Sequence, residues 1–202
     1  VLVYASSGAT YGNLPSPQKV GNESPENTYG FSKYIMDQIA ARFASDNPEL
    51  TIVGLRYFNV YGPKEFYKGK TSSMVIQFGH QILSGNAPKL FKQSDKIYRD
   101  FIYIDDVIQS NIKACATKVN GTFNVGTGKS RSFQDIADIL QVQLGTKLGT
   151  EYISNPYKGY QLNTQADITS TISNLGFEPL ISLEAGIKSY LQEIIFHYNS
   201  LK

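Results

Sequence analysis

The chain has 202 residues, of which 41% are hydrophobic and 18% are charged, with 17 Gly and 8 Pro. This composition is that of a globular protein and excludes a disordered, collagenous or coiled-coil chain. The formal net charge is only +2 and no basic run occurs, which argues against a nucleic-acid partner. The single cysteine excludes an internal disulfide framework and favours a reducing compartment. Because no apolar stretch reaches the roughly 18 residues that span a bilayer, we expect a soluble, cytoplasmic protein with no membrane partner.

The first predicted element is a strand at the very start of the chain. The apolar run Val1-Leu2-Val3-Tyr4 is typical of a strand that is buried on both faces of a parallel sheet. Such a strand needs neighbours on both edges, so we expect preceding residues of a longer polypeptide to complete the sheet. A loop rich in Gly, Pro, Ser and Asn follows. Helical spacing then predicts a helix over residues 28–45 with one apolar face, formed by Ile35, Met36, Ile39, Ala40 and Phe43.

The remainder of the chain alternates between predicted strands and helices. We expect strands at residues 51–57, 89–91, 100–104 and 122–125, and helices near residues 74–82, 105–116, 132–144 and 182–198. Asp105 and Asp106 are expected to cap one helix, and Cys115 is expected to lie in the core on that helix. This alternation predicts an α/β fold with a mostly parallel sheet, and the pieces after residue 63 suggest a second lobe.

Tyr29 and Lys33 are the first candidates for chemistry, because their spacing places both on one helical face. An ammonium group near a phenol stabilises the phenolate, which makes the tyrosine a usable acid or base toward a hydroxyl group. The spacing alone is weak evidence in a chain with 14 tyrosines, and Tyr198 and Lys202 share it. An exposed Tyr–Lys pair without function is the alternative.

Ser7 follows the first predicted strand directly, within Ala5-Ser6-Ser7-Gly8. Ligands of open parallel sheets bind outside the carboxyl ends of the strands. A hydroxyl group there can donate to a substrate oxygen, whereas a serine that only forms a turn is the alternative.

Other patterns predict no site. Gly126-Thr127-Gly128-Lys129-Ser130 imitates the end of a phosphate-binding loop, but Phe123 stands where that motif needs glycine. His80 and His197 have no companions at metal-ligand spacing, so we expect no metal site.

Four motifs occur in a fixed order along the first half of the chain: Ser6-Ser7-x-x-x-Tyr11-Gly12, Tyr29-Gly30-x-Ser32-Lys33, residues 55–63 (LRYFNVYGP) and residues 99–107 (RDFIYIDDV). Together they resemble the extended short-chain dehydrogenase/reductase superfamily of nucleotide-sugar enzymes. Residues 61–74, 88–91 and 164–167 are similar to the ADP-heptose 6-epimerases of that superfamily. The resemblance covers essentially the whole chain.

The resemblance implies a doubly wound, mostly parallel Rossmann-type sheet that is incomplete at its N-terminal side, with a smaller C-terminal α/β lobe. Residues 1–60, joined by residues 102–128, would form the C-terminal part of the NADP-binding domain. Residues 61–202 would form mainly the substrate-binding lobe, interleaved with the first.

The resemblance also implies roles for single residues. Ser7, Tyr29 and Lys33 match the catalytic serine, tyrosine and lysine, and Lys68 matches a second acid or base. Lys33, Val60 and Lys68 match cofactor contacts. The implied substrate contacts are Ser7, Asn59, Lys70, Gln77, Phe91, Lys92, Gln93, Ser94, Arg99 and Tyr160. Lys70 and Gln77 depart from the residues that relatives often have, and a surface ion pair is the alternative for Arg99.

The implied reaction is epimerisation at C6 of ADP-D-glycero-D-manno-heptose to the L-glycero epimer, for lipopolysaccharide core synthesis. It proceeds by transient oxidation and reduction with bound NADP in a homo-oligomer. The residues that select NADP over NAD normally precede the position of Val1. Alternatives are a nucleotide-hexose 4-epimerase, a 4,6-dehydratase, or a non-catalytic fragment or binding module.

Overall fold

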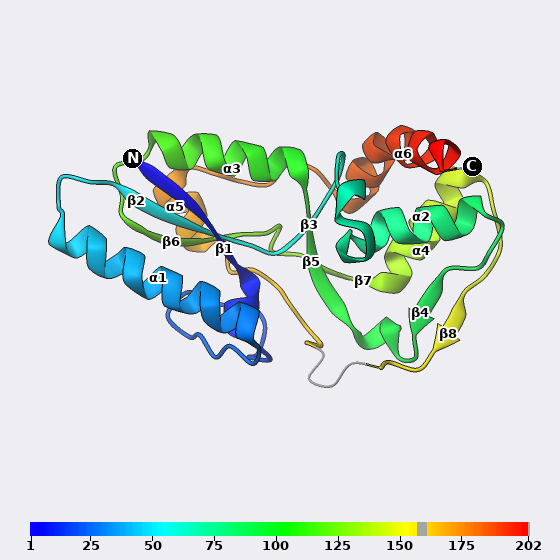
Figure 1. Cartoon of the computed structure of the whole chain (residues 1–202), viewed down its shortest axis with the longest axis horizontal. Helices are drawn as coiled ribbons and strands as arrows, with labels where there is room; N and C mark the ends of the chain where they lie inside the picture. Colours follow the sequence, from blue (N-terminus) through cyan, green and yellow to red (C-terminus); the bar gives the residue numbers. More distant parts are fainter. Residues whose placement is uncertain (157–160, 202) are drawn as a thin grey trace.

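The computed structural model describes residues 1–156 and 161–201, which form two lobes arranged side by side (Figure 1). The first lobe contains a parallel sheet in the order β1-β2-β6. Its strands are β1 (Leu2–Ser7), β2 (Ile52–Tyr57) and β6 (Gly121–Val125). The sheet confirms the prediction of an α/β fold with mostly parallel strands.

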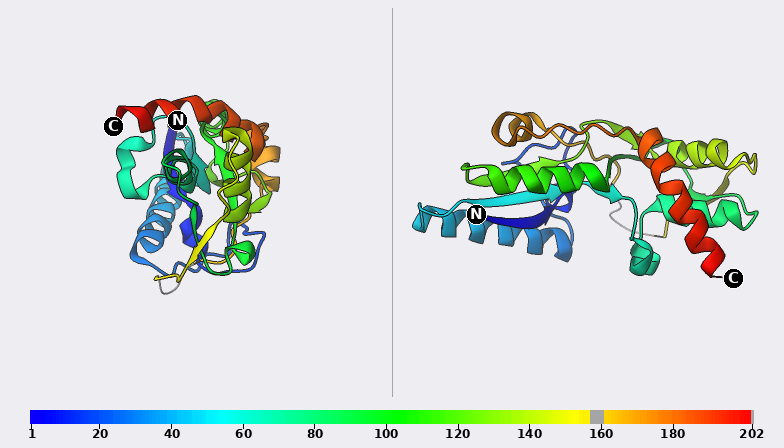
Figure 2. Two further views of the ribbon diagram at one scale, coloured as in Figure 1. Left: turned by 90° about the vertical axis from the view of Figure 1, so that its right-hand side faces the viewer. Right: turned by 90° about the horizontal axis from the view of Figure 1, so that it is seen from above.

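Helices cover both faces of this sheet. Helix α1 (Thr28–Asp46) lies on one face, and α3 (Ile104–Ala116) and α5 (Thr169–Leu175) lie on the other (Figure 2). The core beneath α3 is built from buried apolar side chains of the strands, of α3 and of the segment around α5, namely Val53, Leu55, Ile102, Val107, Ala114, Phe123, Val125, Leu175 and Phe177. Parallel strands joined through helices place all their carboxyl ends at one edge.

The first strand and the first helix differ from the prediction in what they bury. Among the described strands β1 pairs only with β2, and Val1 and Leu2 are 68% and 56% exposed, so the expected burial on both faces is wrong here. Of the apolar face predicted for α1, Ile39 and Phe43 are 64% and 51% exposed, whereas Met36 and Ala40 are half-buried. Helix α1 instead turns Asp37 toward the sheet, because a buried arginine on β2 binds its carboxylate.

The second lobe begins with β3, the strand that follows β2 of the first lobe in the chain. Strand β3 (Asn59–Tyr61) pairs in parallel with β5 (Tyr98–Tyr103), and β5 pairs antiparallel with β7 (Ser130–Ser132). A second pair, β4 (Lys89–Phe91) and β8 (Glu151–Ile153), lies at the far end. Three helices complete the lobe: α2 (Met74–Leu83), α4 (Phe133–Leu144) and α6 (Leu183–Ser200).

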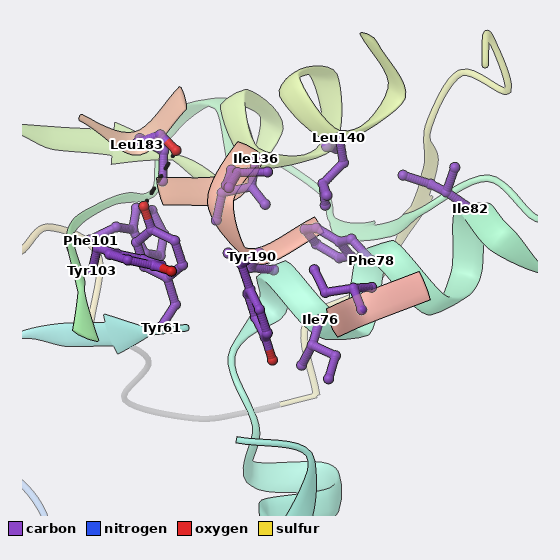
Figure 3. Close-up of a cluster of buried hydrophobic side chains, with 14 of the residues drawn as sticks. Tyr61, Ile76, Phe78, Ile82, Phe101, Tyr103, Ile136, Leu140, Leu183 and Tyr190 are labelled. Carbon is purple, nitrogen blue, oxygen red and sulfur yellow. Dashed lines mark hydrogen bonds between the residues drawn. The ribbon is translucent and has the colours of Figure 1, made fainter. Parts of the chain in front are cut away.

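A continuous apolar core joins these helices to the strands (Figure 3). Phe78, Ile136 and Leu140 from α2 and α4 lie within it, each at most 1% exposed. The hydroxyl group of Tyr61 donates to the carbonyl oxygen of Leu183 at 3.3 Å, which ties β3 to the start of α6. The end of β3 and the loop after it are therefore held against a rigid body.

Several local features were not predicted. Strands β7 and β8 and helix α5 are too short for a periodic signal. Tyr103, rather than Asp105 or Asp106, occupies the N-cap of α3, and the buried Asp106 carboxylate accepts hydrogen bonds from the backbone amides of residues 180 and 181. Cys115 is exposed, so its expected place in the core is wrong, because it lies on the solvent side of α3.

None of the described helices has the length and apolar character to cross a membrane. Within the same residues, His, Cys, Asp and Glu side chains form no group of three or more that could hold a metal ion.

Candidate active site

A cleft of about 780 Å³ opens at the carboxyl ends of the first strands. Seven of the residues singled out in the sequence line it, and they come from both lobes: Ser7, Tyr29, Lys33, Asn59, Val60, Lys68 and Arg99. This is the edge at which open parallel sheets bind ligands. The fold therefore brings together residues that are up to 92 positions apart in the sequence.

One wall of the cleft carries Ser7, Tyr29 and Lys33. Ser7 ends β1, and its Oγ accepts a hydrogen bond from the backbone amide of Ala9 at 3.1 Å. Tyr29 lies in the first turn of α1 and is 56% exposed. Lys33 donates from Nζ to the carbonyl oxygen of Ala5 at 2.9 Å, and Nζ lies 6.0 Å from the centre of the Tyr29 ring. The ammonium group is thus fixed between the strand and the tyrosine.

Asn27 explains why the helix starts where Tyr29 can face the cleft. Its side chain caps α1 by accepting from the Gly30 amide at 2.8 Å. A Cβ atom at Gly30 would lie 2.4 Å from the carbonyl oxygen of Ala9, so only glycine permits the helix to approach β1 this closely. The close approach holds the first turn of α1 beside Ser7.

A buried polar cluster lies behind this wall, between α1 and the strands β1 and β2. Ser6 Oγ and Tyr4 OH donate to the Asp37 carboxylate at 2.9 and 3.0 Å. Arg56 of β2 donates to the same carboxylate through Nε at 2.9 Å and also pairs with Glu23. Burial raises the pKa of Tyr4 to about 12, so this phenol remains a neutral donor. Asp37 lies one turn beyond Lys33 on α1, and the cluster therefore locks the helix to the strand that carries Ser7.

The opposite wall is formed by β3 and by the loop that follows it. Asn59 and Val60 lie on β3, and Asn59 Oδ1 accepts from Thr164 Oγ1 at 3.4 Å. Lys68 lies in η2 (Phe66–Thr71), a 3-10 segment with a kink at Gly69, where φ is +54°. Its side chain is exposed at the cleft.

Arg99 is 5% exposed, which excludes the alternative of a surface ion pair. Its guanidinium group donates to the carbonyl oxygens of residues 98 and 162 at 3.0 and 2.9 Å and to that of Gln161. It also stacks over the ring of Phe133 at 5.7 Å. Arg99 thus holds residues 161 and 162 beside the cleft.

The neighbouring Asp100 takes part in a different contact. Its buried carboxylate accepts from the backbone amides of Thr127, Gly128 and Ala166, at distances from 2.7 to 2.9 Å. Burial raises the pKa of Asp100, although these hydrogen bonds act in the opposite direction. The glycine-containing turn after β6 therefore binds a carboxylate of the protein itself.

Other predicted substrate contacts do not line the cleft among the described residues. Phe91 and Ser94 line a separate hollow of about 60 Å³, which shares Met74 and Phe133 with the cleft. Gln77 donates to the carbonyl oxygen of residue 72 at 2.7 Å. Lys70, Lys92 and Gln93 are exposed, and Tyr160 lies outside the described residues.

Gln161 and Glu65 are polar lining residues that the sequence analysis did not name as site residues. Gln161 reaches the cleft from the far part of the chain, and its side chain donates to the carbonyl oxygen of Gly12. Glu65 is a buried carboxylate, 4% exposed, in the loop before Lys68. No spacing pattern connects either residue to the Ser–Tyr–Lys group, so only the tertiary structure identifies them.

The chemistry of the cleft follows from its charges and its hydroxyl groups. Among the described lining residues, Lys33, Lys68 and Arg99 supply three positive charges against one carboxylate, that of Glu65. This balance favours an anionic ligand, and arginine and lysine are the usual partners of phosphate groups. The Ser7 hydroxyl, the Tyr29 phenol and the two lysines supply groups that can exchange protons with a bound alcohol.

Solved structures with the same fold include several nucleotide-sugar epimerases. An ADP-L-glycero-D-manno-heptose-6-epimerase from Helicobacter pylori is 48% identical, with a TM-score of 0.87 over 96% of this chain and 59% of that chain. A UDP-glucose 4-epimerase from Thermotoga maritima, solved with UDP-glucose, is 29% identical, with a TM-score of 0.87 over 99% of this chain and 64% of that chain. A UDP-glucuronic acid 4-epimerase from Bacillus cereus, solved with NAD, is 26% identical, with a TM-score of 0.83 over 97% and 61%.

The chain thus spans about three fifths of the length of these relatives, and its fold is that of a nucleotide-sugar epimerase. Residues 1–126, which include the Ser7, Tyr29, Lys33 and Lys68 positions, match the NAD dependent epimerase/dehydratase family. With more than half of its residues inside that match, the chain belongs to the NAD dependent epimerase/dehydratase family.

Proposed function

We propose that the protein containing this chain converts ADP-D-glycero-D-manno-heptose to its L-glycero epimer by oxidation and reduction at C6, for lipopolysaccharide core synthesis. One observation carries the proposal: Ser7, Tyr29 and Lys33 line one wall of a cationic cleft, and Lys68 lines the same cleft from the other lobe. The 48% identity to the Helicobacter pylori heptose epimerase supports this substrate over a UDP-hexose.

The residues of the cleft fit a nicotinamide dinucleotide. Lys33 uses one donor for the Ala5 carbonyl and retains two N–H donors for ribose hydroxyl groups. Val60 lines the cleft beside it as an apolar contact, and Lys68 adds positive charge for a phosphate. A bound nicotinamide dinucleotide supplies a reversible acceptor for hydride. Our choice of NADP rather than NAD rests on the resemblance to the heptose epimerases.

The proton chemistry is assigned to residues of this chain. The Lys33 ammonium stabilises the Tyr29 phenolate, which takes the proton of the C6 hydroxyl group when that carbon becomes a carbonyl. The Ser7 hydroxyl donates a hydrogen bond to the carbonyl oxygen as charge develops on it. Inversion requires C6 of the carbonyl to regain its hydride on the opposite face, and Lys68 would protonate the carbonyl oxygen in that second orientation.

We assign the roles of the two lobes accordingly. Residues 1–60 with 102–128 form the C-terminal part of the cofactor-binding domain, and residues 61–202 form mainly the substrate-binding lobe. We also propose a homo-oligomer, which the exposed apolar side chains of Phe31, Ile39 and Phe43 on α1 support. The single cysteine favours a reducing compartment such as the cytoplasm.

The test is Tyr29→Phe in the complete native protein, assayed with both epimers of ADP-heptose. We expect at least about a 100-fold loss of epimerisation with unchanged cofactor binding, because a positioned acid/base group contributes on that scale. Tyr34→Phe, on the same helix but outside the cleft lining, is the control and should keep wild-type turnover. Near-normal turnover of Tyr29→Phe refutes the assignment, and turnover of UDP-hexoses instead supports the alternative 4-epimerase.

A further inference from the structure

Lys68 lies in a loop that has few fixed contacts of its own. The η2 segment is exposed from Tyr67 to Thr71, and its backbone is kinked at Gly69. A lysine side chain in such a loop samples many rotamers. An acid/base group is effective only when its atom lies within hydrogen-bond reach of the substrate oxygen. The position of Lys68 must therefore be fixed by another residue.

Glu65 is the buried residue at the start of this loop. Its carboxylate oxygens accept hydrogen bonds from the backbone amide and the hydroxyl group of Ser73, at 2.7 and 2.6 Å. One of them also accepts from the amide of Gly62 at 3.5 Å. A single side chain thus connects the residues before and after η2 and closes the segment 65–73 into a ring.

The backbone of Lys68 is held inside this ring. The Lys68 amide donates to the carbonyl oxygen of Glu65 at 2.9 Å, and the Lys68 carbonyl oxygen accepts from Thr71 Oγ1 at 2.8 Å. Ser72 Oγ closes the last turn by donating to the carbonyl oxygen of Gly69 at 2.7 Å. Both backbone polar groups of Lys68 are therefore satisfied by the segment that Glu65 closes.

The ring is attached to the rigid part of the second lobe. The Phe66 ring packs on the ring of His197 at 4.3 Å, on helix α6. Tyr190 of the same helix is fully buried, and its hydroxyl group points away from Leu140 and Ile136 (Figure 3). Burial and then the charge of Glu65 raise the pKa of Tyr190. Phe66, which directly follows Glu65, thus attaches the Lys68 loop to α6.

We propose that Glu65 is a positioning residue, which holds Lys68 where its ammonium group can exchange a proton with the substrate. The proposal rests on the proposed function, because it presumes that Lys68 is the second acid or base. It assigns no proton transfer to Glu65 itself, since both carboxylate oxygens are already occupied by Ser73. A displacement of about 1 Å at a catalytic group can cost about 100-fold in rate.

The kinetic test uses the complete protein with bound cofactor and each epimer of ADP-heptose separately. Single-turnover cofactor reduction, followed at 340 nm, reports oxidation of one epimer at a time. We expect Lys68→Met and Glu65→Ala to slow the reaction of the same epimer, by about 100-fold and about 10–100-fold. The other epimer, which depends on Tyr29, should react within about 3-fold of the wild-type rate. Glu65→Gln keeps an acceptor for the Ser73 amide, so it should react with the affected epimer at least about 10-fold faster than Glu65→Ala does.

A second measurement does not depend on activity. Trypsin cleavage after Lys68, identified by mass spectrometry, should accelerate about 10-fold in Glu65→Ala, whereas cleavage after the exposed Lys118 should not change. If Glu65→Ala does not fold, Ser73→Ala can be used instead, because it removes the hydrogen bond from the Ser73 hydroxyl group. It should slow the same epimer, by a smaller factor than Glu65→Ala. Equal slowing of both epimers, or unchanged proteolysis, would overturn the proposal. If Lys68→Met itself slows both epimers equally, the two-base function fails, whatever Glu65 does.

Discussion

The Asp37 carboxylate is the common acceptor of the buried cluster behind Ser7, and Asp37→Ala tests how strongly that cluster holds α1. The side chains of Asp37 and Arg56 are each 2% exposed, and Oδ2 of Asp37 lies 2.8 Å from a terminal guanidinium nitrogen of Arg56. Removal of one partner of a buried ion pair costs about 3–5 kcal/mol when the other charge loses all compensation. Arg56 keeps its pair with Glu23, so we expect the lower end of this range. At about 2–4 °C per kcal/mol for a domain of this size, we expect Tm to fall by about 10 °C.

The same helix offers a matched control. Asp46 pairs with Arg42 at 4.0 Å, but these side chains are 68% and 87% exposed. An exposed pair of this kind contributes about 0.3–0.5 kcal/mol, so Asp46→Ala should lower Tm by only about 1 °C. The measurement is thermal unfolding of the complete protein by circular dichroism at 222 nm. Replacement of Arg56 by Met and of Glu23 by Gln in the Asp37→Ala background should recover part of the loss, because none of these three positions then carries a charge. Equal Tm losses for the two aspartate variants would refute the reasoning.

Two predictions concern pH. Burial and the neighbouring His197 lower the pKa of His80, so the unfolded chain binds more protons than the folded one below about pH 6.5, and stability must fall as the pH drops through this range. His80→Gln should therefore reduce the difference in Tm between pH 7.5 and 5.5. An unchanged difference would contradict the assignment. The Arg131 guanidinium holds the pKa of Glu184 below its usual 4.5 and, against the effect of burial, that of Asp135 below 3.8. Arg131→Met should therefore cost less than about 1 kcal/mol at pH 7. Urea unfolding should show this difference shrinking as the pH falls through the lowered pKa values of the two carboxyl groups, and a constant difference would disprove the ion-pair explanation.

The sequence predicted the parts of the site that lie within one motif. The Tyr29–Lys33 pair needs only helical spacing, and Ser7 needs only its place at the end of an apolar strand. Both signals are local, and the structure brings the three residues to one cleft wall. Lys68 has no local signal beyond a polar loop, and only the resemblance to the epimerases identified it.

The burial of the first elements could not be predicted from their patterns. Periodicity identified α1 correctly, but it assigned the core-facing side to Ile35, Ile39 and Phe43, which are exposed. The residue that faces the sheet is Asp37, because an arginine at an interior position of β2 needs a carboxylate. Arg56 in an otherwise apolar strand was the available signal for a buried ion pair, although the sequence could not identify its partner.

The two proposed acid/base groups are held by supports of different kinds. Tyr29 and Lys33 lie on a helix that a buried ion pair locks to β1, so their geometry is a property of the folded core. Lys68 depends on two hydrogen bonds from Ser73 to Glu65 in a loop whose own surface is exposed. Disruption of the first support must therefore reduce stability, whereas disruption of the second costs little apolar burial and acts mainly on the reaction.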